Sequence, residues 1–194
     1  MSSPKQIRTM LTAGEYLERE RTAEFRSDFV NGDLLPREDA NVDHATITTN
    51  LSSALHQHLR NRPCRTFTSD FKVRIDKANA FRYPDVSGLC GPVLYHDSTH
   101  DAYCNPAVIF EVLSPSSEAF DRGEKFRLYR LLDSLFEYVL VRQDRVEVEV
   151  WTRGNEGVWT SIIYNERIDS FPLRTLDCTL SLGDIYEKVE FGAE

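Results

Sequence analysis

The chain has 194 residues, of which 41% are hydrophobic and 28% charged, and these values are ordinary for one globular domain with a substantial core. Its 23 Lys and Arg against 31 Asp and Glu give a formal charge of −8, which argues against nucleic-acid binding by positive charge over the whole surface. No window approaches the roughly 20 apolar residues of a membrane span, and the N-terminus lacks the apolar core of a signal peptide. We therefore expect a cytoplasmic protein with one domain over residues 1–194.

Two local signals predict the first elements. Thr12 and the glutamate three residues later form a capping-box pattern, which predicts a helix over residues 12–20. Residues 24–35 predict a β-hairpin that turns at Asn31-Gly32, because Asn-Gly is the strongest short hairpin signal. Asp28 precedes this turn and is either a site carboxylate or a solvated hairpin residue.

A long helix and a pair of strands follow. Residues 41–60 carry apolar side chains at spacings near three and four, which predicts an amphipathic helix. His44 lies at its start, where the imidazole either faces a functional site or is a capping or surface group. Apolar and charged residues then alternate between positions 67 and 76, as in strands with one solvated face. Asp70 follows two hydroxyl residues, a pattern that suits either a turn or a site carboxylate.

The stretch from 107 to 113 carries the strongest functional signal. It is an apolar, β-branched run, typical of a strand buried on both faces, yet it contains Glu111. A carboxylate there is costly unless it is paired, protonated or bound to a metal. A helical pattern begins at about Gly123 and places Lys125 in the first turns of a helix, from which its ammonium group can reach Glu111.

A second acid, Asp85, follows Pro84 at the start of another short apolar run. Two neighbouring strands would bring Asp85 beside Glu111, and a divalent cation is the usual way to keep two adjacent carboxylates ionised. Because a metal can activate water and a lysine can stabilise charge on a phosphate, this set suits phosphodiester cleavage. The alternative is that Glu111 and Lys125 form a buried salt bridge that only fixes the strand against its helix.

The remaining segments complete an α/β sandwich with a mixed central sheet. Residues 91–105 predict a long loop, suited to a lid or to an arm at a dimer interface. Glu137 is expected near a strand end, facing water. The four scattered cysteines, Cys64, Cys90, Cys104 and Cys178, are expected to be reduced and to act as small hydrophobic residues. Strands are predicted for residues 135–141, 146–151, 158–164 and 173–182, before a short helix over 184–187.

Several of these motifs together resemble one known family. The motifs are Pro84-Asp85, the segments 111–116 and 121–125, and the segments 29–33, 43–45, 68–74 and 137–141. This combination, over nearly the whole chain, resembles the "putative restriction endonuclease" family of the PD-(D/E)xK nuclease superfamily. The superfamily pattern has its lysine two residues after the second acid, where this chain has Leu113. The resemblance implies that Lys125, on the following helix, takes that place.

The resemblance implies a restriction-endonuclease-like fold, in which helices flank the mixed central sheet, and a metal-dependent endonuclease. Asp85, Glu111 and Lys125 would be the catalytic residues, with Mg²⁺ or Mn²⁺ held by Asp85 and Glu111. Asp28 lies where the family often carries an acid, and the second-tier site candidates are His44, Asp70 and Asp28.

The same resemblance implies a nucleic-acid partner, expected to be DNA, and a homodimer suits the cutting of both strands. The acidic net charge then requires a local basic lining at the mouth of the site, for which the candidates are Arg74, Arg82, Arg122, Lys125 and Arg127. The alternative function is a binding or regulatory module that keeps the nuclease fold without useful activity, and the acidic balance favours this alternative.

Overall fold

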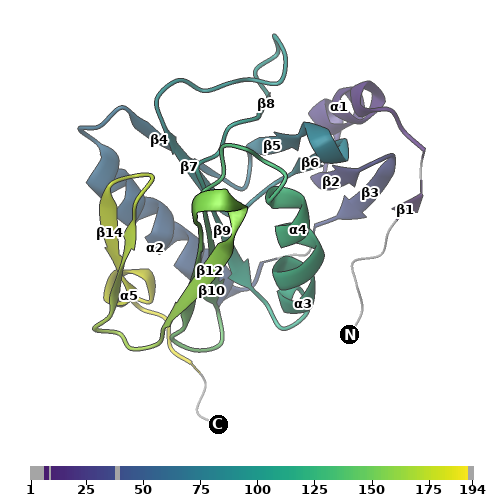
Figure 1. Ribbon diagram of the computed structural model, residues 1–194. Helices are drawn as coiled ribbons and strands as arrows, with labels where there is room; N and C mark the ends of the chain where they lie inside the picture. Colours follow the sequence, from purple (N-terminus) through teal and green to yellow (C-terminus); the bar gives the residue numbers. More distant parts are fainter. Residues whose placement is uncertain (1–6, 9, 38–39, 192–194) are drawn as a thin grey trace.

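The computed structural model describes residues 7–8, 10–37 and 40–191. Most of the N-terminal segment, in which the sequence predicts no signal peptide, lies outside the described residues. Two six-stranded sheets and one two-stranded sheet form the molecule, with helices packed against them (Figure 1). Among the described residues, no helix has the length and apolar character that a membrane span requires.

The six-stranded sheet that contains β9 and β10 is mixed, as the sequence predicts. Its strand order is β12-β11-β10-β9-β7-β4, and only the central β9–β10 pair is parallel. The side chains of β9 are buried along its whole length, as expected for an apolar strand covered on both faces. The strands are β4 (Cys64–Thr68), β7 (Val86–Cys90), β9 (Val108–Leu113), β10 (Glu137–Arg142), β11 (Val148–Arg153) and β12 (Trp159–Tyr164).

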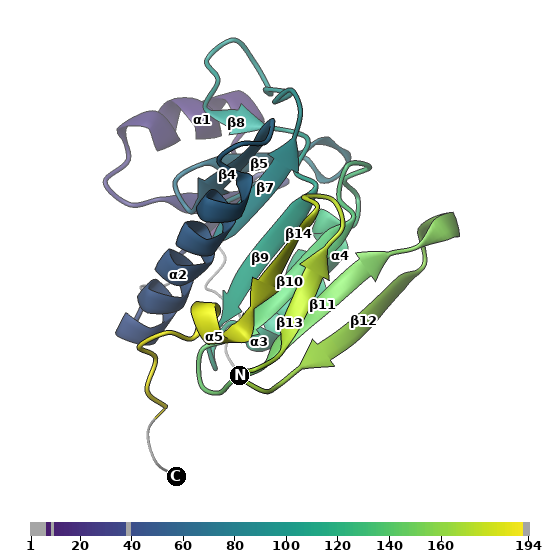
Figure 2. The same ribbon diagram turned by 90° about the vertical axis from the view of Figure 1, so that its left-hand side faces the viewer.

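One face of this sheet is covered by α2 (Val42–Leu59), the β13–β14 hairpin (Ser170–Leu173 and Cys178–Ser181) and α5 (Leu182–Ile185), as Figure 2 shows. Asn41 caps α2 by accepting from the backbone N–H of His44. The apolar stripe of α2 packs into the core as Ile47, Leu51 and Leu55. The predicted helix is confirmed, and its first turn therefore has a fixed position relative to the sheet.

The opposite face carries a single helical segment with a change of pitch. It consists of α3 (Glu118–Phe120), a π-helical turn (Asp121–Lys125) and α4 (Phe126–Tyr129). The apolar side of this segment contacts β9 and β10 through Phe126, Leu128 and Tyr129. Helix therefore begins about five residues earlier than the sequence pattern predicts, and Lys125 ends the π turn.

The second sheet lies beside the first, in the order β1-β3-β2-β6-β5-β8. Its predicted hairpin is present, with Asn31 and Gly32 at positive φ in the turn. Helix α1 (Ala13–Thr22) starts with the predicted capping box and packs Tyr16 onto the sheet. The strands are β1 (Ile7–Arg8), β2 (Ser27–Val30), β3 (Asp33–Pro36), β5 (Lys72–Ile75), β6 (Ala80–Arg82) and β8 (Ala102–Tyr103). The segment 91–105 is not one continuous loop as predicted, because β8 lies within it and pairs in parallel with β5. Two 3₁₀ turns (Asp76–Ala78 and Asn155–Gly157) complete the described structure.

Two sequence predictions about the core are wrong. Glu137 is 1% exposed, and its carboxylate accepts the backbone N–H groups of Arg174 and Thr175 and the Thr175 hydroxyl, so this acid fixes the β13–β14 connection to the sheet. Cys64 and Cys90 are not reduced: they are direct partners in the β4–β7 pair and form a disulfide, while Cys104 and Cys178 are free.

Candidate active site

A cavity of about 400 Å³ opens where α2 begins and β9 ends. Its wall includes the loop after β9, the start of the helical segment and the chain before β7. The three residues predicted to be catalytic, Asp85, Glu111 and Lys125, all line this cavity.

Strand register explains how the two predicted metal-binding acids come together. In the antiparallel β7–β9 pair, Val86 lies opposite Phe110 and Ser87 opposite Ile109. One further step of this register places Asp85 opposite Glu111. Cross-strand partners point to the same face with Cβ atoms roughly 4.5–5.5 Å apart, so the sheet itself sets the two carboxylates side by side.

Asp85 is held by groups from three different segments. Its Oδ2 accepts the backbone N–H of Val112 at 2.8 Å and lies 3.2 Å from Nε2 of His44, while Arg37 approaches Oδ1 at 3.9 Å. Burial alone would raise the pKa of this carboxyl, but the hydrogen bonds from His44 and Val112 and the charge of Lys125 outweigh it and lower the pKa. Asp85 is therefore ionised at neutral pH.

Glu111 is in the opposite situation. It is 1% exposed, one oxygen lies 2.7 Å from the Lys125 ammonium, and the other oxygen has no hydrogen-bond partner. Burial raises the pKa of Glu111 to about 8; Lys125 partly offsets this effect, while Asp85 and Asp121 add to it. A buried carboxylate with one unpartnered oxygen beside a second acid is a poor structural residue and a suitable cation ligand.

The π turn gives Lys125 its position. Its Nζ lies 2.7 Å from Glu111 and 3.2 Å from Asp121, four residues earlier in the chain. Burial lowers the pKa of Lys125, but Asp121, Glu111 and Asp85 together outweigh burial and raise it, so the side chain carries its charge. The ammonium group that the sequence places near Glu111 is thus in contact with it.

The charge balance of the cavity bears on what can enter it. Once a bound cation holds Glu111 ionised, the Asp and Glu side chains of the wall outnumber its Lys and Arg side chains by one, so that cation is what would make room for a phosphodiester. The carboxylates are those of Asp28, Asp85, Glu111 and Asp121, and the cations are Arg37, Arg82 and Lys125.

The donor set fits a hard divalent cation. Within the described part of the chain, no group of three or more His, Cys, Asp or Glu side chains is arranged to hold a metal ion. A cation at Asp85 and Glu111 would thus take two protein carboxylates and complete its shell with water and substrate oxygens, which is the usual behaviour of Mg²⁺. The unpartnered Glu111 oxygen is the observation that supports this fit.

The three second-tier candidates occupy different positions relative to the cavity. His44 is in the site through its contact with Asp85. Asp28 lines the cavity, but its oxygens are taken by Arg82 and by the backbone N–H of Tyr83, so it supports the wall. Asp70 is exposed in the turn between β4 and β5, outside the cavity wall, so the structure does not bring it to the site.

Two site residues escaped the sequence analysis. Arg37 follows β3 and reaches Asp85 across the cavity, and no local pattern distinguishes it from other surface arginines. Asp121 forms a second ion pair with Lys125, beside the one between Lys125 and Glu111. Its spacing of four residues from Lys125 is a recognised helical ion-pair signal, so this residue was accessible to sequence reasoning.

The expected basic lining is largely neutralised. Arg74 pairs with Asp76, Arg82 with Asp28, and Arg122 with Glu118 and Glu149. These three side chains therefore offer little net charge to an approaching phosphate. Of the five predicted cations only Arg82 and Lys125 line the cavity, while Arg74, Arg122 and the exposed Arg127 lie outside its wall.

A mixed sheet that brings an aspartate, a glutamate and a lysine into one cavity defines a restriction-endonuclease-like fold. In agreement, the structure matches that of a "putative nuclease belonging to DUF820" from Anabaena variabilis ATCC 29413 with a TM-score of 0.73, at 16% sequence identity, over 91% of this chain and 97% of that one. Residues 13–183 match the model of the Uma2 family, described as "Putative restriction endonuclease", and the chain belongs to this family.

Two further relatives come from Synechocystis sp. (strain ATCC 27184 / PCC 6803 / Kazusa), and both are uncharacterized proteins. One is 35% identical over 150 residues, which cover 77% of this chain and 85% of that protein. The other is 30% identical over 189 residues, which cover 97% of this chain and 98% of that protein. The similarity therefore extends over the whole fold and includes the segments that build the cavity.

Proposed function

We propose that this protein is a metal-dependent endonuclease that hydrolyses phosphodiester bonds in DNA. Asp85 and Glu111 bind Mg²⁺ or Mn²⁺, and Lys125 faces the scissile phosphate. The observation that carries this proposal is the buried Glu111 carboxylate, which has one unpartnered oxygen beside Asp85 and Lys125 in an open cavity. Membership in the Uma2 family supports it.

Each residue has a defined task in this proposal. The bound cation would lower the pKa of a coordinated water and neutralise charge on the phosphate. His44 holds Asp85 in its ionised form through the contact at Nε2, so that this carboxylate is ready to bind a cation. Lys125 remains charged and, once a cation takes over the Glu111 carboxylate, its ammonium group can donate to a phosphate oxygen.

Calorimetric titration of Mn²⁺ and Mg²⁺ tests the metal site. We expect the wild type to bind, and Asp85→Asn and Glu111→Gln to lose binding while keeping the fold. Glu124→Gln is the matched control, because it removes an exposed carboxylate from the same helical segment and should leave binding unchanged. A wild type that binds neither ion would overturn the proposal.

Cleavage of supercoiled plasmid tests the activity itself. Lys125→Met keeps much of the side-chain volume but removes the charge, and we expect the rate to fall by about 10²–10³, as for the loss of one group that stabilises charge in a transition state. Unaltered cleavage by this variant would remove Lys125 from the mechanism. RNA and single-stranded DNA assayed in parallel identify the substrate class.

The second candidate function is a nuclease-fold binding module without useful activity. The acidic net charge and the neutralised arginines around the cavity favour it. Metal binding without cleavage of any of the three nucleic acids would support this candidate over the endonuclease.

We also propose that the protein forms a homodimer through the free edge of β12. This strand ends the sheet, residues 158–164 carry no charge, and Ile162 is 61% exposed. An uncharged edge strand is a ready template for pairing, and antiparallel pairing with a second copy satisfies both edges at once. Sedimentation of the wild type should show a dimer that Ile162→Lys disrupts and Ile168→Lys, in an exposed loop, preserves; a monomeric wild type would refute this interface.

A further inference from the structure

The positive charge that the cavity lacks is concentrated at the far end of α2. Residues 44–69 contain no Asp or Glu, although the chain has 31 such residues. Three arginines fall within six positions of this stretch, and we call Arg60, Arg62 and Arg65 the basic cluster. In a protein with a formal charge of −8, this is a local reversal of sign.

The basic cluster borders a second cavity, of about 320 Å³, between the end of α2 and β4. His56, Thr66 and Phe67 complete most of its wall, and no acid contributes to it. Arg60 and Arg65 are exposed, and their guanidinium groups make no hydrogen bond or ion pair with any residue that the structure describes. They differ in this respect from Arg82 in the wall of the first cavity, which pairs with Asp28.

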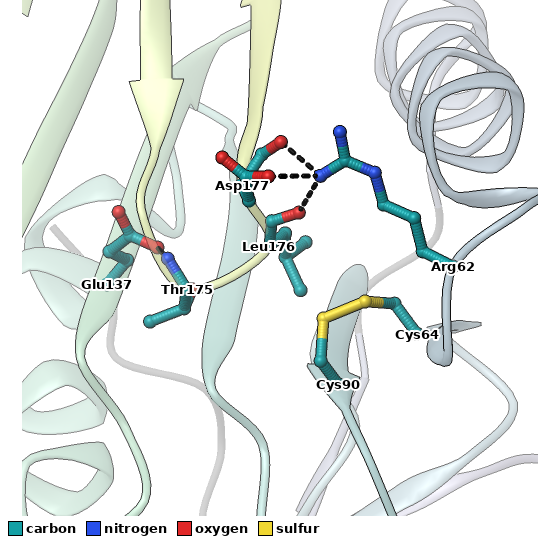
Figure 3. The surroundings of a disulfide bond; sticks show 7 residues. All are labelled: Arg62, Cys64, Cys90, Glu137, Thr175, Leu176 and Asp177. Carbon is teal, nitrogen blue, oxygen red and sulfur yellow. Dashed lines mark hydrogen bonds and ion pairs between the residues drawn. A yellow bond between two sulfur atoms is a disulfide. The ribbon is translucent and has the colours of Figure 1, made fainter.

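The backbone that carries these arginines is tied to neighbouring elements by side-chain contacts and a disulfide. Arg62 donates to the backbone carbonyls of Leu176 and Asp177 and to the Asp177 carboxylate, so the end of α2 is tied to the β13–β14 connection (Figure 3). In the same view, the Cys64–Cys90 disulfide joins β4 to β7 beside this contact. A fixed frame lowers the entropy cost of ordering the two free guanidinium groups on a ligand.

A purely structural role accounts for only part of the cluster. Cations near the last turn of a helix interact favourably with its dipole, and this explains Arg60 at the end of α2. It does not explain Arg65, which lies on β4 opposite Leu89, outside the helix, and has no acidic partner among the residues that the structure describes. An unpaired cation on a stretch without acidic residues points instead to an anionic ligand.

We propose that the basic cluster binds the phosphate backbone of duplex DNA at a position distinct from the catalytic cavity. The choice of ligand rests on the proposed nuclease function. Sixteen helical steps separate His44 from Arg60, a distance of about 24 Å, which is close to seven base pairs of duplex. One DNA segment lying along α2 can thus contact the catalytic cavity and the basic cluster together.

Fluorescence anisotropy with a labelled 20-base-pair duplex, in EDTA to prevent cleavage, tests this proposal. Binding by the wild type is compared over a range of salt concentrations with Arg60→Gln/Arg65→Gln and with the charge-matched control Arg19→Gln/Lys188→Gln. We expect the double variant to lose about tenfold or more in affinity and its log K against log [salt] slope to decrease by nearly 2, since each phosphate contact contributes about 0.9. The control should keep the wild-type slope.

The outcomes are distinct from those of the cleavage assay. Equal slopes for both double variants, or a wild type that does not bind duplex, would overturn this inference. Stronger competition by inorganic phosphate than by chloride at equal ionic strength would assign the cluster to a free phosphate instead, and tighter binding of a matched RNA would assign it to RNA. Salt-dependent duplex binding that needs Arg60 and Arg65 supports the inference even if no cleavage is found.

Discussion

Replacement of Glu111 by glutamine tests directly whether this acid is a cation ligand or a structural partner of Lys125. In the absence of metal, the pKa of Glu111 is raised from 4.5 to about 8. The folded state therefore holds a proton that the unfolded chain releases at lower pH. The free energy of unfolding therefore falls as pH rises from about 5 to 8, by about 1.36 kcal/mol per pH unit and by roughly 3–4 kcal/mol in total.

Urea unfolding in EDTA, without reductant, measures this effect at pH 5, 6, 7 and 8. We expect the free energy of unfolding of the wild type to fall relative to that of Glu111→Gln by about 3–4 kcal/mol across this range, because glutamine does not titrate. Saturating Mn²⁺ should remove most of the difference in the wild type and change little in the variant. If the free energy of unfolding changed with pH in the same way in both proteins and was lower in the variant by a large constant amount, the Glu111–Lys125 pair would be an ordinary buried salt bridge.

Three further substitutions test the structural supports. Cys64→Ser/Cys90→Ser should lower the free energy of unfolding by about 3–4 kcal/mol, from the loop entropy of a bond between residues 26 positions apart; equal unfolding midpoints for the oxidised wild type and this variant would contradict it. Asp28→Ala leaves the Arg82 guanidinium buried without its ion-pair partner and should cost about 3–5 kcal/mol, so an unchanged melting temperature would refute that account. Glu137→Ala leaves the backbone N–H groups of Arg174 and Thr175 without an acceptor and should lower the free energy of unfolding by about 3 kcal/mol or more, with faster amide exchange at Thr175 as the specific sign.

The parts of the fold that the sequence predicts correctly are those fixed by local chemistry. The hairpin turn needs residues that tolerate positive φ, and Asn31-Gly32 supplies them. The capping box of α1 and the apolar stripe of α2 are equally local. The start of the helical segment was placed too late because the serines and proline after β9 favour turns, and the π turn has no periodic signal of its own.

Long-range pairing limits what could be predicted of the site and its surroundings. Cys64 and Cys90 come together only because β4 and β7 pair in one register, and spacing along the chain carries no trace of it. Glu137 is buried because a connection more than thirty residues later covers it, which no local pattern shows. By contrast, Glu111 is conspicuous in the sequence itself, because it is a charged residue in an apolar run, and it leads to Asp85 and Lys125 as its predicted neighbours, which the structure brings into the same cavity.

The disulfide also bears on the predicted location. Disulfides persist in oxidising compartments and are rare in the cytosol, so the Cys64–Cys90 bond and the expected cytoplasmic location disagree. The location therefore stays a prediction, and thiol labelling of the protein taken directly from cells would decide between the two.

The register that sets Asp85 opposite Glu111 has a consequence for how this site tolerates change in length. Side chains on a strand alternate between faces, so one inserted or deleted residue in β7, or between Val108 and Glu111, would turn one of the two acids to the other face of the sheet. The backbone N–H of Val112, which now donates to Asp85, would lose its acceptor at the same time. Viable insertions are therefore confined to exposed connections: residues 98–100, between β7 and β8, can lengthen without moving either acid, whereas the strands themselves cannot.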